Sequence, residues 1–126
     1  MNINLTFNWF FGPHMLGAIY LLFGGIQYFF PPKKINNWYG YRTPLSKSRQ
    51  DIWDEANKFS ALYMMKLGVI FIVIGLCTTT VINVIPMAVK IKEAVSILLL
   101  LVSGMLPAIL MLTATEKHLA KLFGKK

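Results

Sequence analysis

The chain has 126 residues, of which 56% are hydrophobic, and thirteen Lys and Arg against five Asp and Glu give it a formal net charge of +8. This length suits one domain, so residues 1–126 are treated as a single domain. The apolar residues run in long blocks with the charges gathered between them, which excludes a soluble globular domain and a soluble nucleic-acid-binding protein and indicates an integral membrane protein.

The first apolar block predicts a transmembrane helix over residues 13–30. Pro13 suits the first position of a helix, where its missing N–H would have no partner anyway, and Pro31 and Pro32 end the helix. Because no Lys or Arg precedes this block and no small-residue cleavage site follows it, we expect no removable signal peptide. Aromatic residues flank both ends, as at membrane interfaces: Trp9, Phe10, Phe11, Tyr28, Phe29 and Phe30.

Two further blocks without a charged residue predict a second span over residues 67–84 and a third over residues 94–115. Each has roughly twenty residues, which at about 1.5 Å per residue crosses a hydrocarbon layer of about 30 Å. Pro107 is expected to kink the third span, and Gly104 and Ala108 give it a small face for close helix contact. The predicted fold is therefore all-α, a membrane bundle of three transmembrane helices with one interfacial amphipathic helix.

The basic residues predict the orientation of these spans. Seven of them lie in residues 31–66, two in the turn after the second span and four in the tail, while none precedes Pro13. With the N-terminus outside and the C-terminus in the cytoplasm, eleven basic residues face the cytoplasm and two face the exterior, as the positive-inside rule requires.

Residues 31–66 form a cytoplasmic segment that is too long for a simple turn. Its first part, residues 35–44, combines three large aromatic residues with Gly, Arg and Pro. Gly40 can adopt a positive φ, and Pro44 disfavours helix at Thr43, so we expect a structured turn at the membrane surface. Arg42 would extend to the interface or bind phosphate. Composition alone favours a simple interfacial anchor.

The second part of the segment predicts an amphipathic helix. Ser48 is placed to cap its start, with Asp51 three residues later, and apolar residues recur at helical spacing from Ile52 to Tyr63. This helix either lies flat at the interface or runs straight into the second span, with Gly68 as a bend. Asn57 is expected at the edge of the apolar stripe, where it would tie the helix to the turn. The simplest interpretation is a helix that covers the cytoplasmic side of the bundle.

These two parts together resemble the signature of the SdpI family, which consists of bacterial membrane proteins related to the immunity protein for the sporulation delay peptide toxin. The pattern joins an aromatic-Gly-Tyr-Arg-Thr turn to a Trp-x-x-x-Asn helix, between a first span and two further spans. The residues that carry the resemblance are Asn37, Trp38, Tyr39, Gly40, Tyr41, Arg42, Thr43, Pro44, Ser46, Ser48, Trp53 and Asn57.

The resemblance implies a multi-pass protein of the bacterial cell membrane that gives immunity to a membrane-active peptide toxin by binding. The partner would be the peptide or its lipid-linked target, besides membrane lipids. Aromatic residues would supply contact (Trp38, Tyr39, Tyr41 and Trp53), Arg42 a fixed charge and Gly40 the turn, while Asn37 and Asn57 would hold the loop against the helix. The alternatives are a signalling module that sequesters a cytoplasmic repressor and a small lipid or amphiphile transporter.

The sequence carries little sign of catalysis. His14 and His118 would lie on opposite sides of the membrane and cannot share a metal, and no common hydrolase or metal motif is present. Asp51, Asp54 and Glu55 are interpreted as a solvated helix face. We therefore expect no enzyme, no metal and no cofactor. Because no span carries an ionisable group at its centre, an ion pump is poorly supported too.

Overall fold

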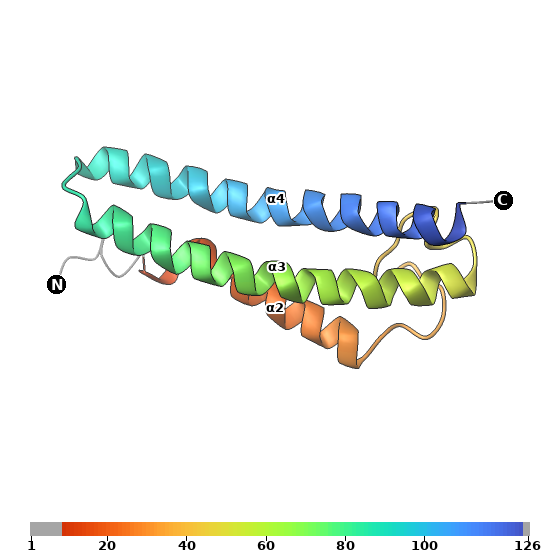
Figure 1. Ribbon diagram of the computed structural model, residues 1–126. Coiled ribbons are helices and arrows are strands. Elements are labelled where there is room, and N and C mark those ends of the chain that lie inside the picture. Colours follow the sequence, from red (N-terminus) through yellow and green to blue (C-terminus); the bar gives the residue numbers. More distant parts are fainter. Residues whose placement is uncertain (1–8, 125–126) are drawn as a thin grey trace.

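The computed structural model describes residues 9–124, and within that range its three long elements are all helices (Figure 1). Helix α2 covers Pro13–Phe29, α3 covers Gln50–Val84 and α4 covers Val89–Phe123. Helices α3 and α4 run antiparallel, while α2 packs mainly on α3. The described residues contain no strand, so the all-α prediction is confirmed.

Only some of the helix ends lie at the residues that the sequence predicted. Helix α2 begins at Pro13 after Gly12 and stops before Pro31, as expected. Helix α3 begins at Gln50 with Arg49 in the capping position, and no side chain caps it. The predicted cap was therefore wrong, because the Ser48 hydroxyl donates instead to the carbonyl oxygen of Leu45 at 2.6 Å.

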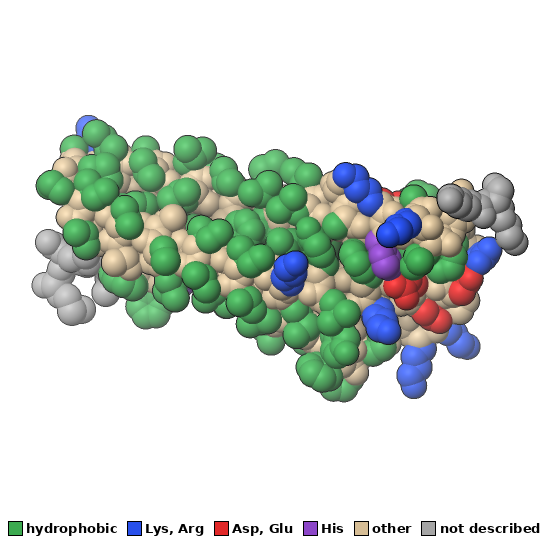
Figure 2. All heavy atoms as spheres, in the orientation of Figure 1, with side chains coloured by type: hydrophobic (Ala, Val, Ile, Leu, Met, Phe, Trp, Pro, Cys, Tyr) green, Lys and Arg blue, Asp and Glu red, His purple; other side chains and the backbone are tan. Residues whose placement is uncertain are grey.

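The predicted amphipathic helix and second span are one continuous helix, α3, so the interfacial helix is not a separate element. Helices α3 and α4 each have 35 residues and are long and apolar enough to cross a membrane. At about 1.5 Å per residue each extends for about 50 Å, well beyond a hydrocarbon layer of about 30 Å. Charged side chains gather at the end of the molecule where α3 begins and α4 ends (Figure 2).

Glycine residues bring α2 and α3 into backbone contact. A Cβ added at Gly17 would lie 2.6 Å from the backbone nitrogen of Ile72, and one added at Gly68 would lie 2.6 Å from that of Leu21. Gly68 is thus a packing position inside a continuous helix rather than a bend. At Gly104 in α4 an added Cβ would make only ordinary contact, at 3.6 Å, so the close approach of small residues lies between α2 and α3.

A small core lies at the charged end, which is called the loop end here: loop 30–49, the beginning of α3 and the end of α4. Its buried residues are Tyr41 from the loop, Ile52 and Ala56 from α3, and Leu119 from α4. Leu45, Met111 and Phe123 pack around them. The loop is therefore folded onto both long helices, and this fixed platform carries the signature residues.

Candidate functional site

Gly40 is the tightest point of the signature turn. Its φ is +100°, the left-handed region that the sequence predicted. A Cβ at this position would lie 2.7 Å from Cγ of Pro32 and would also collide with Oδ1 of Asn57. Residues with a side chain are disfavoured at such a φ, so both the backbone conformation and the available space require glycine.

Asn57 fastens this turn to α3, as predicted. Its side chain is 1% exposed. Oδ1 accepts a hydrogen bond from the backbone N–H of Tyr41 at 2.6 Å, while Nδ2 donates to the carbonyl oxygen of Trp53 at 2.9 Å. A buried N–H without a partner costs about 1–3 kcal/mol. The Trp-x-x-x-Asn spacing therefore places an amide one helical turn past Trp53, directly beneath the turn.

Gln27 of α2 completes the buried amide network, although the sequence analysis did not place it in the site. It is 6% exposed. Its Nε2 donates to the carbonyl oxygen of Asn57 at 3.0 Å and to Oγ of Ser60 at 2.8 Å. A lone glutamine near the end of an apolar block was the only available signal. The network of Gln27, Asn57 and Ser60 thus joins α2, α3 and the turn at one point.

Two of the predicted contact residues, Tyr41 and Trp53, are buried. The indole Nε1 of Trp53 donates to the carbonyl oxygen of Pro32 at 2.8 Å, which fixes the chain as it leaves α2. The Tyr41 hydroxyl donates to Oε1 of Glu116 at 2.9 Å and so connects the turn to α4. Burial, with the nearby Glu116 carboxylate second, raises the pKa of the Tyr41 phenol above its usual value. Both rings therefore lie in the interior of the loop end and not on its outer surface.

Four signature residues lie on the exposed face of the turn. Trp38 is 91% exposed, and Arg42, Asn37 and Tyr39 are also exposed. The side-chain oxygen of Asn36 accepts hydrogen bonds from the backbone N–H groups of Trp38 and Tyr39, both at 2.8 Å, and so fixes the loop locally. The structure therefore exposes the indole of Trp38 and the guanidinium of Arg42 on a backbone that hydrogen bonds hold in place.

Asn37 has a different role from the one predicted. Its backbone carbonyl accepts a hydrogen bond from the Arg42 guanidinium, and its side-chain oxygen accepts one from the ammonium of Lys47 at 2.7 Å. All three residues belong to the loop, so Asn37 orients the loop's cations and does not hold the loop against α3. Asn57 alone of the two asparagines does that.

Thr43 and Ser46 close the turn. The backbone N–H of Thr43 donates to Oγ of Ser46 at 2.9 Å, and the backbone N–H of Ser46 donates to Oγ1 of Thr43 at 3.2 Å. The fully buried Ser46 hydroxyl also donates to the carbonyl oxygen of Tyr41 at 3.0 Å. This reciprocal pair fixes the chain direction after Arg42.

Helices α3 and α4 are clamped near the site by a pair that the sequence analysis missed. Nε2 of His118 lies 2.7 Å from Oε1 of Glu55. The imidazole also stacks on Phe59 with a centroid distance of 4.0 Å. The interpretation of Glu55 as part of a solvated face was therefore wrong, because α4 places a histidine against it. Asp54 remains exposed and accepts a hydrogen bond from Nε2 of Gln50 at 2.7 Å.

Two grooves flank the amide network, and both reach Gln27. One, of about 500 Å³, lies between the end of α2 and the first turns of α3. The other, of about 230 Å³, lies between the signature turn, α3 and α4. Within residues 9–124 no group of three or more His, Cys, Asp or Glu side chains is placed to hold a metal ion.

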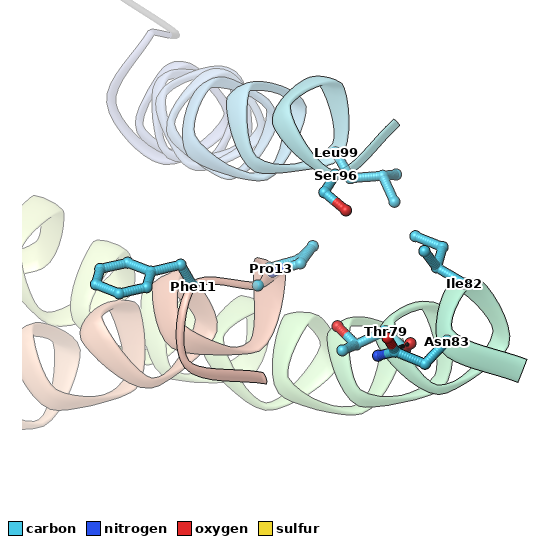
Figure 3. Close-up of a pocket in the computed structure, with 8 residues that line it drawn as sticks. Phe11, Pro13, Thr79, Ile82, Asn83, Ser96 and Leu99 are labelled. Atoms are coloured by element: carbon cyan, nitrogen blue, oxygen red, sulfur yellow. Dashed lines mark hydrogen bonds between the residues drawn. The ribbon is translucent and has the colours of Figure 1, made fainter. Parts of the chain in front are cut away.

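A third hollow lies at the opposite end of the bundle (Figure 3). Pro13 of α2, Thr79 and Ile82 of α3, and Leu99 of α4 line it together with neighbouring residues. Its volume of about 10 Å³ is at the lower limit for one water molecule. Of these three hollows, the two with room for a ligand larger than water lie at the loop end.

Comparison with known proteins identifies the family. Residues 33–115 match the SdpI/YfhL protein family, so the chain belongs to it. The chain is 43% identical over 60 residues to the Bacillus subtilis (strain 168) protein named uncharacterized protein YfhL. That match covers 48% of this chain and 54% of the relative, so it spans about half the length of each. No solved structure matches the chain.

Proposed function

We propose that this member of the SdpI/YfhL family protects a bacterium against a membrane-active peptide toxin by binding. The bound partner is the membrane-inserted peptide or the lipid-linked target that the peptide uses. Family membership supports an immunity-type membrane protein. The proposal is also supported by the hydrogen-bonded loop that carries the exposed Trp38 at the loop end.

The observation that carries this proposal is the contrast between the two faces of the signature turn. Beneath it, Tyr41, Trp53 and Asn57 are buried and hydrogen-bonded. Above it, Trp38 is 91% exposed, and the exposed Arg42 donates a hydrogen bond to the backbone carbonyl of Asn37, the residue before Trp38. A large aromatic side chain held in solvent on an ordered backbone is a typical anchor for a partner, and tryptophan and arginine are enriched among residues that dominate binding.

The proposed arrangement in the bilayer has three spans: α2, residues 67–84 of α3 and residues 94–115 of α4. The N-terminus lies outside, and the loop end and the C-terminus lie in the cytoplasm. Support comes from the charges gathered at the loop end (Figure 2) and from the positive-inside rule. The turn would then meet a peptide that has reached the inner leaflet.

Cysteine labelling tests this orientation. In a Cys77→Ser background, Ala88→Cys in the link between α3 and α4 should react with a membrane-impermeant reagent in whole cells. Lys121→Cys near the end of α4 should react only after the membrane is opened. Both positions are exposed in the structure. The opposite labelling pattern would reverse the orientation and place the turn outside the cell.

Survival measurements test the function itself. A sensitive bacterium that expresses the chain is challenged with a panel of membrane-active peptides, and wild-type protein is expected to protect against at least one of them. Trp38→Ala should lose that protection at matched membrane levels. Ile97→Ala, an exposed position of α4 far from the turn, is the control and should retain it. Failure of the wild type against the whole panel, or equal protection by Trp38→Ala, would contradict the proposal.

A further inference from the structure

The larger groove at the loop end combines buried amides, an apolar wall and charges of both signs. Gln27 and Asn57 of the amide network line it from within, and Tyr28, Pro31 and Pro32 form an apolar wall. Lys33, Asp54 and Lys58 supply its charged groups. At about 500 Å³ it is within the size range of small-molecule sites, and it does not depend on the exposed Trp38.

The charged groups of this groove are available to a ligand. Within residues 9–124 Asp51 pairs with Arg49 and Glu55 lies against His118, and no salt bridge joins Lys33 or Lys58 to a carboxylate. Asp54 accepts a hydrogen bond from Gln50 through Oδ1. Two cations beside one carboxylate complement a zwitterion, since Asp54 opposes a purely anionic group and the lysines oppose a purely cationic one.

The position of the groove indicates which zwitterion it receives. It opens where α2 ends, next to Tyr28, Phe29 and Phe30, whose rings are exposed. In the bilayer arrangement proposed above, exposed aromatic rings at the end of a span mark the headgroup level. Leu22, Phe23 and Ile26 on the preceding turns of α2 are also exposed and apolar. A ligand at this place has its polar group in the groove and its chains beside α2.

We infer that this groove binds the headgroup of a phospholipid that carries both a phosphate and a primary ammonium, such as phosphatidylethanolamine. The phosphate lies against the ammonium groups of Lys33 and Lys58, and the lipid ammonium donates to the Asp54 carboxylate. Lipids with a trimethylated ammonium lack that donor, and lipids with a hydroxylated anionic headgroup lack the cation. The inference uses the proposed membrane arrangement but not the proposed immunity.

Native mass spectrometry of the full chain in detergent tests the inference. The probes are phosphatidylethanolamine, phosphatidylcholine and phosphatidylglycerol with identical acyl chains, and soluble phosphoethanolamine as a competitor. Phosphatidylethanolamine should bind at least about tenfold more tightly than the other two lipids, the effect of one charge-assisted hydrogen bond. Phosphoethanolamine should compete only weakly, because it has no chains to lie beside α2.

Two variants and one control decide which groups bind. Asp54→Asn, which keeps an acceptor for Gln50, should abolish the preference for phosphatidylethanolamine over phosphatidylglycerol. Lys58→Gln should weaken the binding of both lipids. Glu93→Gln, an exposed change near the opposite end of the bundle, should change neither. Equal retention of the three lipids by wild type, unchanged binding by both variants, or full displacement by phosphoethanolamine would overturn the inference. Toxin survival does not enter this readout, so failure here leaves the proposed immunity standing.

Discussion

Replacing Gly40 with Ala should detach the signature turn from α3. Alanine at this position would have to keep the φ of +100°, a backbone conformation that costs an L-residue about 1–2 kcal/mol. It would also displace Oδ1 of Asn57 from the backbone N–H of Tyr41, which is now 2.6 Å away. A buried N–H left unpaired adds about 1–3 kcal/mol. The two terms together predict a local destabilisation of about 2–5 kcal/mol.

Hydrogen exchange of the Tyr41 backbone amide measures this directly on purified protein in detergent. A loss of 2 kcal/mol corresponds to about a thirtyfold fall in protection. Gly25→Ala is the matched control, because the added Cβ would meet no atom within 4 Å beyond its chain neighbours and the adjoining backbone of its own helix, and alanine favours helix over glycine by about 1 kcal/mol. It should leave Tyr41 protected. Unchanged protection of Tyr41 in Gly40→Ala would refute the account of how Asn57 holds the turn.

Three other substitutions test neighbouring parts of the site. Gln27→Leu removes the donors to Asn57 and Ser60 and should lower the free energy of unfolding in detergent by about 1–3 kcal/mol. A decrease no larger than that caused by Ser60→Ala would contradict this. His118→Ala combined with Glu55→Gln should show a coupling of about 0.5–3 kcal/mol in a double-mutant cycle, and simple additivity would count against the clamp. Arg42→Lys keeps the charge but loses the planar fork, so toxin protection should fall at matched membrane levels, and equal survival would make Arg42 a mere anchor.

The helical architecture could be predicted from the sequence because prolines and uncharged blocks mark it plainly. Pro13, Pro31 and Pro32 bound α2 within one residue of the expected span. The extent of α3 could not be fixed in this way. Helical spacing looks the same inside and outside a bilayer, and no residue between Gln50 and Val84 breaks a helix. Gly68 was a plausible bend until the position of α2 showed that it is a contact between helices.

The turn was predictable at Gly40 and Asn57, because glycine adopts a positive φ far more readily than residues with a side chain and an asparagine at the edge of an apolar stripe needs partners. The burial of Tyr41 was not predictable. Aromatic residues beside Arg and Gly are typical of an exposed interface. Here contacts with residues distant in the sequence bury the ring instead. Tyr41 meets Glu116 across 75 positions of sequence, and no local pattern specifies such a pairing.

The Glu55–His118 clamp illustrates the same limit for charged residues. Glu55 lies in the first turns of α3, where a solvated position and the helix dipole suffice to explain an acid. Its partner is 63 positions away on α4. The antiparallel pairing of α3 and α4, which brings the two together, follows from the register of the bundle rather than from either segment alone.

Photo-cross-linking tests the central claim, that the exposed face of the turn binds the toxin or its target without altering it. A photoreactive amino acid replaces Trp38 in one variant and Ile97 in another, and each is illuminated in membranes with a labelled peptide against which the protein gives protection. We expect a cross-link from position 38, none from position 97, and recovery of the free peptide at its original mass. Recovery of a cleaved or modified peptide would contradict the account, and so would a cross-link to the peptide from position 97 alone.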